Sequence, residues 1–102
     1  MVCGGLTMKI LAMECETEHA DWSGAQPLLA DEARHVYDLY LKNVVREIYF
    51  TEAHEAVLIL ECGSVDEAQQ LLDALPLVKS GLIRFELTRL LPYDGYSRLM
   101  GA

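Results

Sequence analysis

The order of apolar patterns along the chain constrains the fold more than any single motif. Four stretches have the alternation or the β-branched and aromatic content of strands; they are MKILAMECE (8–16), VVREIYFT (44–51), EAVLILEC (55–62) and LIRFELTRL (82–90). Two other stretches repeat apolar residues every three or four positions, as amphipathic helices do. The chain is therefore predicted to run β-α-β-β-α-β.

Both predicted helices carry start signals. Pro27 suits the first turn of the first helix, whose apolar stripe ends near Asn43. That stripe comprises Leu29, Ala33, Val36, Tyr37, Tyr40 and Leu41. The second helix begins at a capping box formed by Ser64 and Glu67, and Pro76 is expected to end it.

This order predicts an α+β fold of ferredoxin-like βαββαβ topology, in which a four-stranded antiparallel sheet carries two helices on one face. The first and third strands, residues 8–16 and 55–62, have apolar residues on both sides. The face without helices would therefore still be apolar. Burying it against a second copy is the simplest way to remove it from water, so we expect a homodimer or a higher homo-oligomer.

With 102 residues, of which 52% are apolar, the chain is expected to form one domain. We assign residues 1–7 to a flexible leader, residues 8–92 to the folded domain and residues 93–102 to a C-terminal tail. Met8 is a candidate for the true start of the packed domain. The segment MVCGGLT lacks the basic region and the long apolar run of a signal peptide.

Charge and composition exclude several classes of function. The net charge of −8 disfavours nucleic acid and anionic membranes as partners. The three cysteines are too scattered for a disulfide framework, which favours reduced thiols in a cytoplasmic protein. The three histidines lack the spacing of a helical metal site, and no glycine-rich phosphate loop is present. We therefore expect neither a metal nor a cofactor.

Arg46 is a candidate binding residue on the second predicted strand. In a regular strand it shares one face with Ile48 and Phe50. An arginine on a covered apolar face must be paired or must line a cavity. Two interpretations stay open: an ion pair with a carboxylate such as Glu14 or Glu86, or a bond to the carboxylate of a ligand.

Four further residues could take part in chemistry. Glu32 borders the apolar stripe of the first helix, where partial burial would raise its pKa toward that of a general base; the alternative is a solvated carboxylate favoured by the helix dipole. His54 can carry a proton, or is simply a turn residue between two strands. Tyr40 and Tyr49 could bind a small ring or pack in the core.

Several short motifs in this order and spacing carry a family resemblance; they are Leu29-Ala30-Asp31-Glu32, Arg46 followed by Tyr49, Ala53-His54-Glu55-Ala56, Ser64-Val65 and Leu75-Pro76-Leu77. The chain resembles muconolactone isomerases from the first strand to about Pro92. The resemblance implies a dimeric α+β barrel and a proton shift, without metal or cofactor, in a small carboxylated or lactone substrate. It also implies that Arg46 holds the substrate carboxylate and that Glu32 and His54 move the proton.

Three functional hypotheses remain, and whether the chain is an enzyme stays open. The first is this isomerase-like proton shift, which requires Arg46 to point inward with Glu32 or His54 near the same space. The second is a cofactor-free monooxygenase or cyclase on the same scaffold, with a deep apolar pocket lined by Trp22 and tyrosines. The third is a non-catalytic dimeric ligand-binding protein, with a filled interior and Arg46 locked in an ion pair.

Overall fold

The computed structural model describes residues 6–101. The leader expected over residues 1–7 therefore lies largely outside the described residues. The elements are β1 (Met8–Glu16), α1 (Gln26–Leu41), β2 (Val45–Phe50), β3 (Ala56–Cys62), α2 (Val65–Asp73), α3 (Pro76–Lys79), β4 (Ile83–Leu90) and the 3-10 helix η1 (Gly95–Met100). The predicted order of strands and helices is confirmed.

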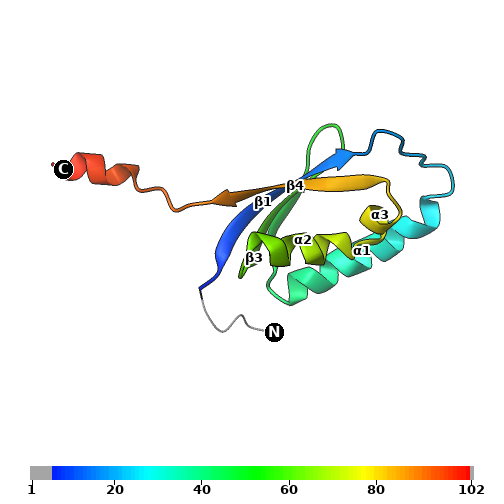
Figure 1. The fold of residues 1–102 in the computed structure, drawn as a ribbon, viewed down its shortest axis with the longest axis horizontal. Coiled ribbons are helices and arrows are strands. Elements are labelled where there is room, and N and C mark those ends of the chain that lie inside the picture. The colour runs from blue at the N-terminus through cyan, green and yellow to red at the C-terminus, as the bar shows by residue number, and fades with distance from the viewer. Residues whose placement is uncertain (1–5, 102) are drawn as a thin grey trace.

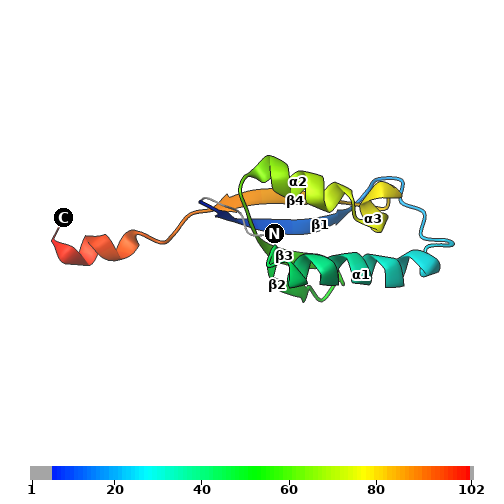
Figure 2. The same ribbon diagram turned by 90° about the horizontal axis from the view of Figure 1, so that it is seen from below.

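The four strands form one antiparallel sheet in the order β2-β3-β1-β4, with the helices packed against it. This is the predicted ferredoxin-like α+β topology. Figures 1 and 2 show α1 and α2 over the same face of the sheet, and in Figure 2 the two helices are separated, with strands visible between them. Helix α1 contacts the edge strand β2, and α2 contacts β3 and β4.

The core lies between the sheet and the helices. Its fully buried members on the strands are Ile10, Ala12, Val45, Leu58, Leu60 and Cys62, and those on and just after α2 are Ala68, Leu72 and Leu75. The strand members pair across the sheet as Ile10 with Leu60 and Ala12 with Leu58, so they share one face. Burial on one face of a sheet fixes the strand register, because a one-residue slip would turn these side chains outward.

The helix-free face has an apolar centre and charged margins. Leu11 pairs with Ile59 and Met13 with Val57, and Met13 keeps 44% of its surface exposed. Toward one end of this face Lys9 lies opposite Glu61, and their charged groups are 3.6 Å apart. An exposed apolar patch on a sheet is a common site of protein association.

The prediction that Arg46 shares one face of the sheet with Ile48 and Phe50 is wrong. The register of β2 against β3 shifts between Val45 and Glu47, which is a β-bulge. Val45 and Ile48 both pair with residues of the helix-covered face, so the extra residue turns Arg46 to the opposite face. There its guanidinium lies 3.5 Å from the carboxylate of Glu61.

The end of the second helix also differs from the sequence prediction. The second helix ends at Asp73, and Pro76 begins the short helix α3 instead of terminating α2. Proline suits the first turn of a helix because the missing N–H would have no partner there.

Beyond β4 the chain leaves the sheet and carries η1 away from the folded body (Figure 1).

Candidate functional site

A cavity of about 560 Å³ lies between α1 and the sheet. Its helix wall is formed by Leu29, Glu32, Ala33, Val36, Tyr37 and Tyr40, and its sheet wall includes Glu14, Ile48, Phe50, Ala56, Leu58 and Phe85. Val45 of β2 and Leu77 of α3 complete the lining. Its volume falls in the range of pockets that hold small organic ligands.

The cavity exists because α1 packs loosely against the sheet. Of the 16 residues of this helix, only Leu39 is buried. Tyr37 and Tyr40, both on the apolar stripe, remain 59% and 54% exposed. On the facing edge strand Ile48 and Phe50 are also exposed. Aromatic and aliphatic side chains therefore surround an opening that no part of residues 6–101 fills.

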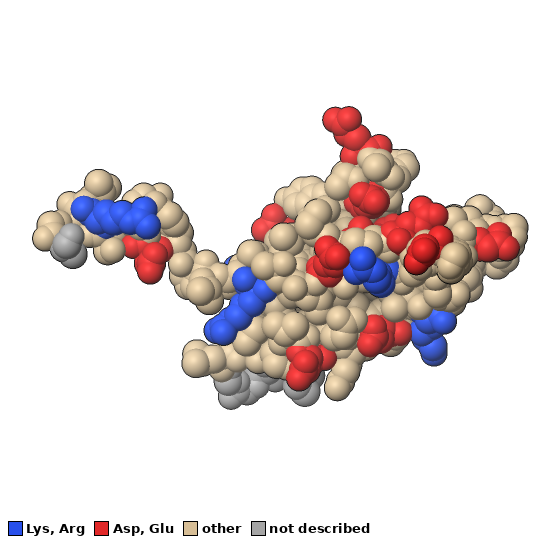
Figure 3. Space-filling view, turned by 45° about the horizontal axis from the view of Figure 1, so that its top comes forward, with Lys and Arg blue, Asp and Glu red and all other residues tan. Residues whose placement is uncertain are grey.

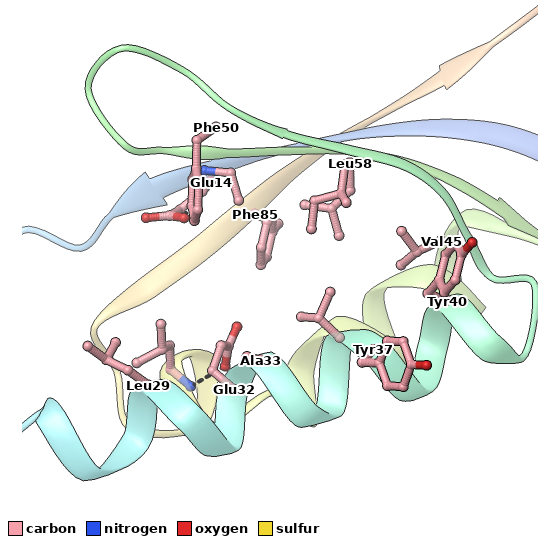
Figure 4. A pocket seen from close by; sticks show the side chains of 14 residues that line it. Glu14, Leu29, Glu32, Ala33, Tyr37, Tyr40, Val45, Phe50, Leu58 and Phe85 are labelled. Atoms are coloured by element: carbon pink, nitrogen blue, oxygen red, sulfur yellow. Dashed lines mark hydrogen bonds between the residues drawn. The ribbon is translucent and has the colours of Figure 1, made fainter.

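Glu32 is the half-buried acid of this cavity. It projects from α1, and one carboxylate oxygen accepts a hydrogen bond of 2.9 Å from the backbone N–H of Leu77 (Figure 4). Burial is the largest effect on its pKa and raises it above the ordinary glutamate value; the bond from Leu77 acts in the opposite direction. The nearby charge of Glu14 adds to the rise. Such a carboxyl is closer to a neutral-pH proton carrier than a solvated glutamate.

Glu14 is the second acid, a residue expected from the sequence only as a possible ion-pair partner of Arg46. It projects from β1 on the wall opposite Glu32 (Figure 4). Its carboxylate accepts a hydrogen bond of 2.9 Å from the backbone N–H of Ala56. Its alternation with Ile10 and Ala12 on β1 would have indicated this position, because all three share the covered face.

The structure brings together two of the five predicted site residues, Glu32 and Tyr40. Tyr49 projects on the helix-free side and its hydroxyl donates to Glu47 over 2.8 Å. Arg46 lines a separate, more polar hollow of about 370 Å³ beside Tyr40 and Asn43.

His54 and Trp22 also lie apart from the cavity lining. His54 occupies the β2–β3 hairpin with a positive φ of 61°, and its ring contacts Phe50 at a centroid distance of 5.2 Å. A positive φ is typical of turn residues, which agrees with the structural interpretation of this histidine. The indole N–H of Trp22 donates to Glu16 over 3.1 Å.

Within residues 6–101 no group of three or more His, Cys, Asp or Glu side chains is arranged to hold a metal ion. The helices of this region are also too short or too polar to span a membrane. Comparison with protein-family models gives no match for the chain, and comparison with curated proteins gives none. The cavity and its two acids are therefore the features on which a functional proposal can be based.

Proposed function

We propose that the chain is a small isomerase-like enzyme that shifts a proton within an uncharged, unsaturated molecule such as a lactone, without a cofactor. The observation that supports this most is the half-buried carboxyl of Glu32, with its raised pKa, in the wall of an apolar cavity. A general base must lie against the substrate and have a pKa near the working pH. Glu32 lines the cavity, which meets the first requirement, and burial shifts its pKa upward, in the direction of the second.

The lining favours a lactone over a carboxylated substrate. The described residues that line the cavity include two carboxylates, Glu14 and Glu32, and no arginine, lysine or histidine. A bound carboxylate would lose its water shell and meet like charges, and both effects oppose binding. Arg46, the residue expected to hold such a group, lies on the other face of the sheet.

The proposed reaction needs one carboxyl group, which first accepts a proton from the substrate and then returns it. The Glu32 carboxylate removes a proton from the carbon next to the lactone carbonyl, and the C–H electron pair becomes part of an enolate. The resulting carboxylic acid returns the proton to a carbon further along the conjugated system, and the double bond shifts. Atoms and electrons balance without an oxidant or a metal. The apolar walls keep bulk water away from the enolate.

The proposal includes assembly and location. The helix-free face, with Leu11, Met13 and Ile59 at its centre, is the surface that we expect a second copy to bury in a homodimer. Cys15 forms no disulfide, which is compatible with the reducing environment of the cytoplasm. A dimer of this kind leaves the cavity accessible, because the cavity lies on the helix-covered face.

Deuterium exchange tests the proposed chemistry. Unsaturated γ-lactones are incubated with the protein in D₂O, and loss of ring-proton NMR signals is followed. Glu32→Gln keeps the size of the side chain and an oxygen that can accept from Leu77, but it removes the base, so exchange should fall by about 10²–10⁴-fold. Glu18→Gln, in the exposed loop before α1, is the matched control. Equal exchange by Glu32→Gln and wild type would refute the role of Glu32.

One observation favours a second candidate, a protein that binds a small apolar molecule without turnover. Glu14 and Glu32 each already accept a backbone N–H, so both carboxylates have a structural use without any chemistry. In that case a lactone or a similar apolar molecule would bind with no exchange above the rate in buffer. The same NMR experiment therefore separates the two candidates.

A further inference from the structure

The cavity between α1 and the sheet contains negative charge that no described lining residue neutralises. Glu14 lines it from β1 and Glu32 from α1, and both side chains are partly buried (Figure 4). The described lining residues include no arginine, lysine or histidine. Within residues 6–101 neither carboxylate takes part in a salt bridge. A carboxylate that is moved out of water loses hydration energy, and a nearby positive charge restores part of it.

The two carboxylates also act on each other. Burial is the largest effect that raises the pKa of Glu32, and the negative charge of Glu14 adds to this rise. The two side chains are therefore close enough to repel each other. A positive charge placed between them would replace this repulsion with attraction on both sides.

Each carboxylate keeps one oxygen available for a ligand. Oε1 of Glu14 accepts from the backbone N–H of Ala56, and Oε1 of Glu32 accepts from that of Leu77, both over 2.9 Å. Within the described part of the chain, Oε2 of each side chain accepts no hydrogen bond. The backbone bonds thus hold the two carboxylates on facing walls, with an acceptor free on each. A primary ammonium group has three N–H donors and can donate to both.

The rest of the lining suits the organic part of such a cation. Four aromatic rings lie among aliphatic side chains in the cavity wall; they belong to Tyr37, Tyr40, Phe50 and Phe85. The rings of Tyr37 and Tyr40 stack on α1 with their centroids 6.1 Å apart. The face of an aromatic ring carries partial negative charge, so it attracts a cation as well as apolar groups. Aromatic faces are a common means by which proteins recognise organic ammonium ions.

The surface charge of the chain acts in the same direction. Figure 3 shows acidic side chains over much of the visible side of the body, with few basic side chains among them. The net charge of the chain is −8. A field of this sign raises the local concentration of cations and lowers that of anions. The cavity and the surface of the chain therefore both favour a positively charged ligand.

We propose that the cavity binds small hydrophobic amines in their protonated form, with the ammonium group between Glu14 and Glu32 and the apolar part against the aromatic rings. Such an amine occupies the space of the lactone, so it inhibits the proton shift by competition. No bond is made or broken, and the amine is released unchanged. The inference rests on the cavity of the proposed function but not on the proton shift itself.

Calorimetric titration with three probes of similar size tests the charge preference. The probes are 2-phenylethylammonium, the neutral 2-phenylethanol and the anionic phenylacetate, each added to the full chain at neutral pH. We expect the ammonium ion to bind at least about tenfold more tightly than the alcohol, a difference that corresponds to about 1.4 kcal/mol. Phenylacetate should bind more weakly than the alcohol. Equal affinities for the ammonium ion and the alcohol would overturn the proposal.

Variants that remove one charge test which residues hold the ammonium group. Glu14→Gln and Glu32→Gln keep the size of the side chain and an oxygen that can accept from the backbone N–H. Each should weaken binding of 2-phenylethylammonium about tenfold or more, because a hydrogen bond to a charged group is lost. Binding of 2-phenylethanol should stay within about threefold of wild type, which shows that the cavity is intact.

Glu18→Gln is the matched control, because it removes the same charge from the exposed loop before α1. It should leave the affinity for 2-phenylethylammonium unchanged. A loss as large as in Glu14→Gln would mean that only the net charge attracts the amine, which would overturn the site. An unchanged affinity in both cavity variants would overturn it as well. Where a cavity variant fails to fold, the three-probe comparison on the wild-type chain still decides.

Deuterium exchange separates this inference from the proposed function. Exchange of a lactone that proceeds while 2-phenylethylammonium neither binds nor slows it would refute the amine site and leave the proton shift standing. Binding of the ammonium ion that depends on both carboxylates, without any lactone exchange, would refute the proton shift and leave the amine site standing. The two failures are therefore distinguishable.

Discussion

The two long helices lie on the same sheet, but they pack against it very differently. On α2, Ala68 and Leu72 have no exposed surface, and Leu75, just beyond its end, keeps 2%. On α1, which is nearly twice as long, the single buried residue is Leu39. Both helices have an apolar stripe, so hydrophobic periodicity alone does not distinguish a helix that fills the core from one that borders a cavity.

The N-terminal end of α2 is also better capped than that of α1. Ser64 caps α2 by accepting from the N–H of Glu67 over 3.0 Å, and Glu67 accepts in return from Gly63. The N-cap of α1 is Ala25, whose side chain makes no capping bond. The α2 half of the molecule therefore contributes more to the stability of the fold. The α1 half leaves apolar surface and a carboxyl group available for a ligand.

The largest expected effect comes from truncating the same side chain in each helix. Leu72→Ala removes fully buried methyl groups and should cost about 2–5 kcal/mol of unfolding free energy. Leu29→Ala, at a position already 42% exposed, should cost about 1 kcal/mol and should weaken ligand binding instead. Urea denaturation measures both. Equal costs would show that α1 is packed as tightly as α2.

Removal of the α2 cap should have the next largest effect. Ser64→Ala leaves the N–H of Glu67 without its acceptor and should lower the unfolding free energy by about 1 kcal/mol. Ser64→Asp, which can still cap, is the matched control. A stability loss in both variants would contradict a capping role. Ligand binding at the α1 cavity should be the same in all three proteins.

The pH dependence of stability isolates Glu32. Because its pKa is raised in the folded state, mainly by burial, the folded protein retains this proton at pH values where the unfolded chain has lost it. The unfolding free energy therefore falls as the pH rises from about 4.3, the ordinary glutamate value, through the raised pKa, and stays lower above it. The difference between wild type and Glu32→Gln should show this fall. A constant difference across the range would show that Glu32 is fully solvated.

The smallest effect is expected for Arg46→Ala, on the opposite face of the sheet. Its ion pair with Glu61 is exposed, so the loss of unfolding free energy should be within about 1 kcal/mol. Ligand binding at the cavity should not change, with Arg46→Lys as the charge-conserving control. Loss of binding in Arg46→Ala alone would move the site from the α1 face to the helix-free face.

The topology could be predicted from sequence because each element carries its own local pattern. The alternation in residues 8–16 and 55–62 and the capping box at Ser64 depend on neighbours in the chain, and the structure confirms all three. The bounds of most elements differ from the prediction by only one or two residues at a strand end. The break after Asp73 is an exception, because proline can begin a helix as well as end one.

The candidate site was harder to predict because it depends on contacts between distant segments. A single β-bulge places the Arg46 side chain on the opposite face of the sheet. No residue near Arg46 in the sequence indicates that bulge. The distance between α1 and the sheet is set by packing along the whole helix. The apolar stripe of α1 alone therefore does not predict the cavity. Glu32 was identified from its place beside that stripe, and the structure does place it in the cavity wall.

An NMR titration with an unsaturated γ-lactone tests most directly whether the α1 cavity is the ligand site. The account predicts saturable methyl and amide shifts at Val36, Ile48 and Leu58, which line the cavity, with Leu72 of α2 unaffected. Shifts confined to the surroundings of Arg46 and Glu61, or no saturable shift at all, would contradict it.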